Sequence, residues 1–133
     1  MINFQPIEPK DREIFERFYP FKTIQNSESS FANLCAYSFI YNGEWAIIDN
    51  CLVTRIHFEK NSHICYHYPI GNGDKDKIIE KLINYSKENN VVMSVICEKK
   101  DRKPCFENKF NIKEERDFFD YLYLREDLAD LKG

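Results

Sequence analysis

Residues 68 to 74 read YPIGNGD and stand between an apolar run and the helical pattern KDKIIEKLINYSKE. Glycine lets backbone N–H groups approach a ligand closely, and a helix N-terminus offers unpaired N–H groups to a phosphate. The candidate cofactor-binding residues are therefore Tyr68, Gly71, Asn72, Gly73 and Asp74. The alternative is a tight strand-to-helix turn, which Asp74 favours because a carboxylate at the helix cap repels an anion.

A second candidate for chemistry is the stretch HICYH, residues 63 to 67. Alternate residues of a strand share a face, so His63, Cys65 and His67 would point the same way, as metal ligands do. Four strand steps span about 13 Å, however, so the two histidines cannot both reach one zinc ion at about 2 Å. We therefore predict no metal site, and hydrogen-bonded imidazoles on a sheet face are the alternative. A general-base role for His67 near the strand end also stays open.

No catalytic residue can be assigned from the sequence. Five cysteines occur without a CxxC spacing, which argues against a disulfide framework and a cysteine-rich zinc site. Cys51 and Cys97 lie in apolar runs, where a buried cysteine is normally inert packing. The basic cluster at residues 99 to 103 is interpreted as a solvated helix face. The aromatic run FFDYLYL, residues 118 to 124, is interpreted as core or domain-interface packing.

The composition is that of one ordinary globular domain. The chain has 133 residues, of which 43% are hydrophobic, with only 4 Gly and 5 Pro. The net charge of -3, with both signs mixed along the chain, gives no sequence-wide footprint for nucleic acid. The N-terminus lacks the apolar core of a signal peptide and no run is long enough to span a bilayer, so we expect a cytoplasmic protein.

Hydrophobic periodicity and turn residues predict the elements that would position these candidates. The N-terminal half should contain a strand at 4–7, a helix from Glu8-Pro9 to Pro20, and a helix capped by Ser27 or Ser29 with Phe31, Leu34, Cys35 and Phe39 as its buried stripe. An antiparallel three-stranded meander over 45–70, a helix over 75–88 capped by Asp74, and a fully buried strand over 91–97 should follow. A helix at 102–110 and strands at 112–115 and 118–124 complete the order. This predicts an α+β fold, β-α-α-β-β-β-α-β-α-β-β, whose mixed, mostly antiparallel sheet has helices on both faces.

That element order resembles the fold of the GCN5-related N-acetyltransferases. In that family a Q/R-x-x-G-x-G/A loop follows the fourth strand and holds the pyrophosphate of coenzyme A. Gly71 and Gly73 match its two small positions, whereas Tyr68 stands where Gln or Arg is expected. The resemblance implies an acyl donor near residues 66–73. Coenzyme A or acyl-coenzyme A is then the candidate cofactor, and none is required if the loop is only a turn.

A closer resemblance rests on NSESSFANL (26–34), YPIGNGD and DYLYLREDLADLKG (120–133). These stretches are similar to a group of uncharacterised bacterial proteins related to the C-terminal domain of phosphatidylglycerol lysyltransferases. Members carry two acyltransferase-like domains in tandem, and this chain resembles the first. The resemblance implies one domain at 1–124, the start of a linker at 125–133, and the second domain of the family chain as partner. Aminoacyl-tRNA or acyl-coenzyme A is the expected donor, and a homodimer is a further expectation.

Two functions remain open. In the first, the chain is half of a tandem acyl or aminoacyl transferase. This half has no complete active site of its own and braces or orients the second domain. The alternative is a self-contained acyl-coenzyme A-dependent N-acyltransferase that uses the Gly71–Gly73 loop. Tyr68 at the Gln/Arg position, the acidic Asp74 and the lack of an evident acid/base pair favour the first.

Overall fold

The computed structural model describes residues 2–21, 30–58, 60, 62–97 and 109–111. The chain divides into two compact units, Met1–Arg102 and Lys103–Gly133, and all elements below belong to the first. The strands expected at 112–115 and 118–124, and nearly all of the helix expected at 102–110, lie outside the described residues. The same holds for the boundary expected at residue 124, which stays a prediction.

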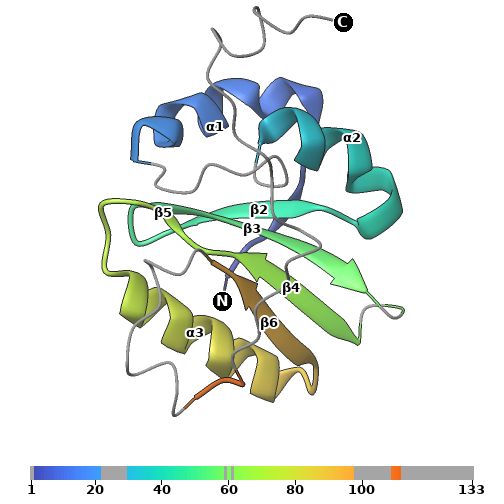
Figure 1. Ribbon diagram of the computed structural model, residues 1–133, viewed down its shortest axis with the longest axis vertical. Helices are drawn as coiled ribbons and strands as arrows, with labels where there is room; N and C mark the ends of the chain where they lie inside the picture. The colour runs from blue at the N-terminus through green and yellow to red at the C-terminus, as the bar shows by residue number, and fades with distance from the viewer. Residues whose placement is uncertain (1, 22–29, 59, 61, 98–108, 112–133) are drawn as a thin grey trace, which may run out of the picture. The chain divides into compact units, whose positions relative to one another are not determined.

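Within the described chain, six strands form one mixed, mostly antiparallel sheet (Figure 1). They are β1 (Gln5–Pro6), β2 (Glu44–Ile48), β3 (Cys51–Phe58), β4 (His63–His67), β5 (Ile70–Gly71) and β6 (Val92–Ile96). The order is β1-β2-β3-β4-β6, with β5 also paired to β3, and the pairing of β4 with β6 is parallel. The predicted α+β fold with a mostly antiparallel sheet is confirmed.

The hairpin between β2 and β3 fixes the register of the meander. Asp49 and Asn50 form its two-residue turn with φ of 46° and 64°, the left-handed backbone that two-residue hairpins need. Ile48 therefore faces Cys51 across the turn, and every later pair of the two strands follows from that one.

The third strand of the predicted meander is interrupted rather than continuous. Arg55 pairs with Tyr66, but Leu52 pairs with Ile70, so the register shifts by one residue between β4 and β5. A one-residue shift of this kind is a β-bulge. Pro69 lies in the interruption, and proline inside a sheet is confined to bulges and edges because it has no N–H to donate.

Helices cover both faces of the sheet, as predicted. Figure 1 shows α1 (Arg12–Phe18) and α2 (Phe31–Tyr41) on one face and α3 (Lys75–Glu88) on the other. Short 3-10 helices, η1 (Pro9–Asp11) and η2 (Tyr19–Phe21), extend α1 at its two ends. As predicted, the α-helix ends before Pro20, and a 3-10 turn carries the chain through that residue.

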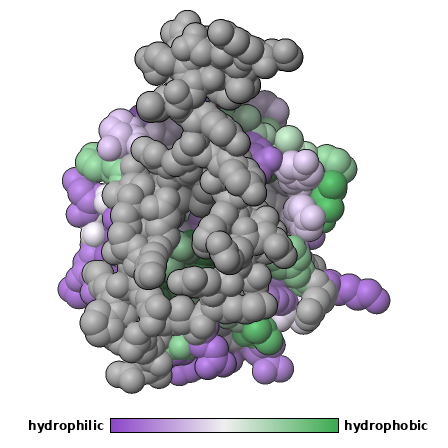
Figure 2. Space-filling model, viewed as in Figure 1, coloured by the Kyte–Doolittle hydropathy of each residue, from purple (hydrophilic) through white to green (hydrophobic). Residues whose placement is uncertain are grey.

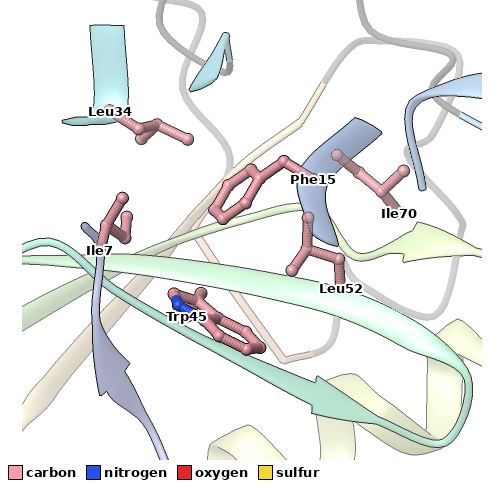
Figure 3. Close-up of a cluster of buried hydrophobic side chains, with 6 residues drawn as sticks. All are labelled: Ile7, Phe15, Leu34, Trp45, Leu52 and Ile70. Atoms are coloured by element: carbon pink, nitrogen blue, oxygen red, sulfur yellow. The ribbon is translucent and has the colours of Figure 1, made fainter. Parts of the chain in front are cut away.

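A hydrophobic core lies between the sheet and the helices α1 and α2 (Figure 3). Its buried side chains are Ile7, Phe15, Leu34, Trp45, Leu52 and Ile70. The rings of Phe15 and Trp45 meet edge to face with centroids 6.4 Å apart, the geometry that aromatic pairs prefer. The buried carboxylate of Asp11 accepts a hydrogen bond from Trp45 Nε1 at 3.0 Å, which ties the start of α1 to β2.

Helix α2 differs from its prediction at both ends. Its N-cap is Ser30, whose Oγ accepts a hydrogen bond from the backbone N–H three residues on at 3.3 Å, and neither Ser27 nor Ser29 holds that position. Phe39, which was predicted to be buried, is 80% exposed. Five residues rotate a helix by about 140°, so Phe39 cannot share the face of the buried Leu34.

Helix α3 has the predicted bounds and the predicted cap. Asp74 Oδ1 accepts a hydrogen bond from the Lys77 N–H at 3.3 Å. The buried residues of α3 are Ile78, Ile79, Leu82 and Ser86. In contrast, the prediction of a fully buried strand after α3 is wrong, because β6 is half-buried and its Val92 is 63% exposed. Among the described strands, β6 has a neighbour, β4, on one side only.

Candidate functional site

The glycines of the predicted binding loop pack against the hairpin turn between β2 and β3. A Cβ atom at Gly71 would overlap the carbonyl oxygen of Asn50, and the φ of Gly71 is 154°, a conformation that other residues rarely adopt. A Cβ atom at Gly73 would overlap the carbonyl oxygen of Asp49. The close approach that requires glycine is therefore an approach between two segments of the protein itself.

Several polar groups of this loop already have partners inside the protein. Gly71 pairs with Cys51 in the β3–β5 ladder. The backbone N–H of Gly73 donates a hydrogen bond to the Cys51 thiol. At the helix cap, the Asp74 side chain accepts a hydrogen bond from the backbone N–H of Lys77. Asn72 and Asp74 are the exposed residues of the loop, and the arrangement joins β5 tightly to α3.

Tyr68 is an internal anchor rather than a surface group. Its side chain is 4% exposed, with the Lys75 ammonium 5.5 Å from the centre of its ring. Its backbone N–H donates to the carbonyl oxygen of Ile96 at 2.9 Å. The strands β4 and β6 thus remain hydrogen-bonded one residue beyond their ladder, next to the bulge.

The two cysteines weighed as nucleophiles lie in different environments. Burial raises the pKa of the Cys51 thiol, although the Gly73 amide and Lys75 favour the thiolate. A raised pKa keeps the thiol protonated, which is the opposite of an activated nucleophile. Cys97 is exposed, so the expectation that it is buried packing is wrong.

The histidines of HICYH are hydrogen-bonded to neighbouring strands. His63 Nε2 lies 2.9 Å from Ser94 Oγ, and the buried His67 Nδ1 lies 3.1 Å from Thr54 Oγ1. This confirms the interpretation of the stretch as a sheet face with hydrogen-bonded imidazoles. In the part of the chain that the structure describes, no three His, Cys, Asp or Glu side chains are grouped so that they could hold a metal ion.

A cluster that sequence reasoning missed joins Glu44, Arg55 and His57. Glu44 Oε2 accepts hydrogen bonds from Arg55 Nε at 2.6 Å and from His57 Nε2 at 2.8 Å. The Arg55 guanidinium is buried and lies 3.8 Å from the centre of the Phe4 ring, within the range of a cation–π contact. The cluster could have been predicted from the hairpin, because the two-residue turn places Glu44 opposite Arg55.

Glu44 is held in its charged form by this cluster. Burial raises the pKa of the carboxyl, but the hydrogen bonds from His57 and Arg55 outweigh it and lower the pKa below the ordinary value of 4.5. Behind the carboxylate, Arg55 Nη1 and His57 Nδ1 are buried and make no hydrogen bond with the described residues.

Glu44 and His57 form one wall of an open cleft of about 420 Å³. Its other lining residues are Pro6, Ile7, Ser38, Phe39, Asn42 and Gly43. The imidazole cannot readily exchange a proton with a ligand there, because Glu44 occupies its Nε2 and its Nδ1 is buried. The cleft can therefore present a carboxylate to a small hydrogen-bond donor, but the lowered pKa of Glu44 makes that carboxylate a weak base for acyl transfer.

No helix among the described residues is both long enough and apolar enough to cross a membrane. This finding covers α1, α2 and α3, of which the longest, α3, has 14 residues.

Comparison with known proteins identifies the family of the chain. Residues 21–133 match the model of the family described as phosphatidylglycerol lysyltransferase, C-terminal. The structure is similar to a crystal structure of a conserved protein of unknown function from Bacteroides thetaiotaomicron VPI-5482, with a TM-score of 0.83 and 32% sequence identity. The similarity covers 100% of this chain and 46% of that one, so the chain spans about half the length of its relative. No curated protein gives a significant match. The chain belongs to the family of phosphatidylglycerol lysyltransferase C-terminal domains.

Proposed function

We propose that this chain is one half of a tandem acyl or aminoacyl transferase, and that it braces or orients a second acyltransferase-like domain. Its family supports this, since the phosphatidylglycerol lysyltransferase C-terminal domain gives the match over residues 21–133. A second support is length, because the similar bacterial protein is about twice as long as this chain. On this proposal, the donor-binding site and the catalytic residues lie mainly in the other half.

The observation that carries the proposal is the packing of the glycine loop. A phosphate cradle needs open space above its glycines and N–H groups that point at the ligand. Here the carbonyl groups of Asp49 and Asn50 take the space beside Gly73 and Gly71. The Gly73 N–H is directed at the Cys51 thiol.

The surroundings of the loop support the same proposal. A donor in a GNAT-like fold would lie where central strands separate, near residues 66–73. In this region Tyr68 donates its N–H to Ile96, so that β4 and β6 stay joined. The cleft beside Glu44 offers only a weak base among the described residues, because both nitrogens of His57 are engaged or buried and the pKa of Glu44 is lowered.

Isothermal titration calorimetry of the chain with coenzyme A, acetyl-coenzyme A, a longer acyl-coenzyme A and aminoacyl-tRNA tests the proposal. We expect no binding tighter than about 1 mM, the affinity of a weak, non-specific contact. The variant Asp74→Asn should favour coenzyme A binding if the loop is a phosphate site, because asparagine caps a helix equally well and removes the charge that repels a phosphate. Glu88→Gln makes the same charge change at the far end of α3 and is the matched control.

Micromolar binding of an acyl-coenzyme A would overturn the proposal. If Asp74→Asn tightened that binding while Glu88→Gln left it unchanged, the loop would be a phosphate site. The self-contained N-acyltransferase would then be the better description of the chain.

A further inference from the structure

The outer face of α2 is apolar, although a helix on a protein surface normally places charged residues there. None of the 11 residues of α2 carries a charge. We define the outer face by five of the exposed residues of α2, which are Ala32, Ala36, Tyr37, Phe39 and Ile40. Phe39 is 80% exposed and Ile40 53% exposed, and Figure 2 shows apolar surface at the right-hand edge of the view, in the region of α2.

The chemistry of the outer face limits its partner. A helix that lies on a lipid surface carries lysine or arginine beside its apolar residues, and a nucleic-acid surface needs such cations for the phosphates. The outer face has neither. Its aromatic and aliphatic side chains instead match the core of a protein–protein interface, which is depleted in charge and rich in tyrosine and phenylalanine.

We propose that the outer face of α2 binds a second copy of this chain. Two uncharged faces can meet without burying an unpaired charge, whose cost would otherwise oppose association. In a two-fold pair the same surface meets itself, so large residues must face small ones. The outer face provides both, because Ala32 and Ala36 leave room along the helix for Tyr37 of the other copy.

The size of the outer face sets the strength of the pair. The exposed parts of Tyr37, Phe39 and Ile40, together with the neighbouring Tyr41, amount to roughly 400 Å². That is about half of the ~800 Å² per partner that a standard stable interface buries. We therefore expect a weak dimer with a dissociation constant on the order of 10 µM. This inference goes beyond the proposed function and does not depend on it.

Sedimentation velocity of the chain from about 1 to 200 µM, a range that brackets this affinity, tests the proposal. The average mass should rise from that of a monomer towards twice that value. Ile40→Lys places like charges against each other across the two-fold axis and should weaken association at least about tenfold. Val92→Lys changes another exposed aliphatic residue, on β6, and should leave association unchanged. Circular dichroism checks that both variants keep the fold.

A charge-exchange mixture makes the test independent of any folding defect. Ile40→Lys and Ile40→Glu should each be monomeric alone, whereas their mixture should form a mixed dimer. A wild-type chain that stays monomeric at the highest concentration would overturn the proposal. So would a dimer that Ile40→Lys does not weaken, or a monomer that floats with phosphatidylglycerol vesicles. None of these results bears on donor binding, so the proposed function would stand or fall separately.

Discussion

At the scale of single residues, packing explains the two loop glycines, and replacing one of them should measurably destabilise the fold. Gly73→Ala should lower the free energy of unfolding by about 2–3 kcal/mol, because the new Cβ would meet the Asp49 carbonyl group. Gly43→Ala is the control, since its Cβ would lie 3.2 Å from the Ser38 Cβ, a contact that a small shift relieves. Both changes affect the unfolded chain equally, so the difference in urea unfolding measures the native contact. Equal effects would show that the loop has room for a side chain.

The Glu44 carboxylate gives a second prediction at this scale. Its pKa is lower in the folded chain than the ordinary value of 4.5, so the folded state releases the proton more readily than the unfolded state. The stabilisation is therefore complete above the unfolded-state pKa, and it is lost as the pH falls through the folded-state pKa. At pH 7, Glu44→Gln should cost about 2 kcal/mol, because it leaves the buried Arg55 without its counter-charge.

Urea unfolding as a function of pH measures this effect. The difference between wild type and Glu44→Gln should shrink as the pH falls below 4.5. Glu16→Gln is the control, since the exposed Glu16–Arg12 pair should contribute less than about 0.5 kcal/mol at any pH. A Glu44→Gln effect that did not change with pH would mean that shape, and not charge, holds the cluster together.

At the scale of elements, the start of α3 depends on one side chain. Asp74→Ala should lower the free energy of unfolding by about 1 kcal/mol, because it removes the acceptor for the Lys77 N–H. Asp74→Asn should retain most of that stability, since the amide oxygen accepts the same hydrogen bond. Thermal unfolding followed by circular dichroism compares the two, and equal losses would assign the role of Asp74 to its charge.

Local sequence signals predicted some elements well and failed at others. Helix α3 has the predicted bounds, because strong periodicity and the turn residues on either side specify it. The break between β4 and β5 was missed, since the pairing of Ile70 with Leu52 depends on a neighbouring strand. Among the four residues predicted for the buried stripe of α2, Phe39 failed because it lies about 140° around the helix from Leu34, the member that is buried.

At the scale of the whole molecule, the sequence alone could not show how the candidate site is used. The motif YPIGNGD was located correctly as a strand-to-helix connection before α3. Which atoms fill the space beside Gly71 depends on the hairpin turn, some 20 residues earlier in the chain. Such contacts between distant segments do not leave a local pattern. The Glu44 cluster could have been found, but only by extending the register of a predicted hairpin.

Trp45 gives the molecule a built-in optical reporter. It is the single tryptophan of the chain, it is 6% exposed, and it contacts Phe15 of α1 while donating its indole N–H to Asp11. An indole in such a dry site emits at shorter wavelength than one in water. Its emission will therefore shift to the red only when the contact between α1 and the sheet opens. Fluorescence thus follows the opening of this one layer, whereas far-ultraviolet dichroism follows the backbone of all layers together.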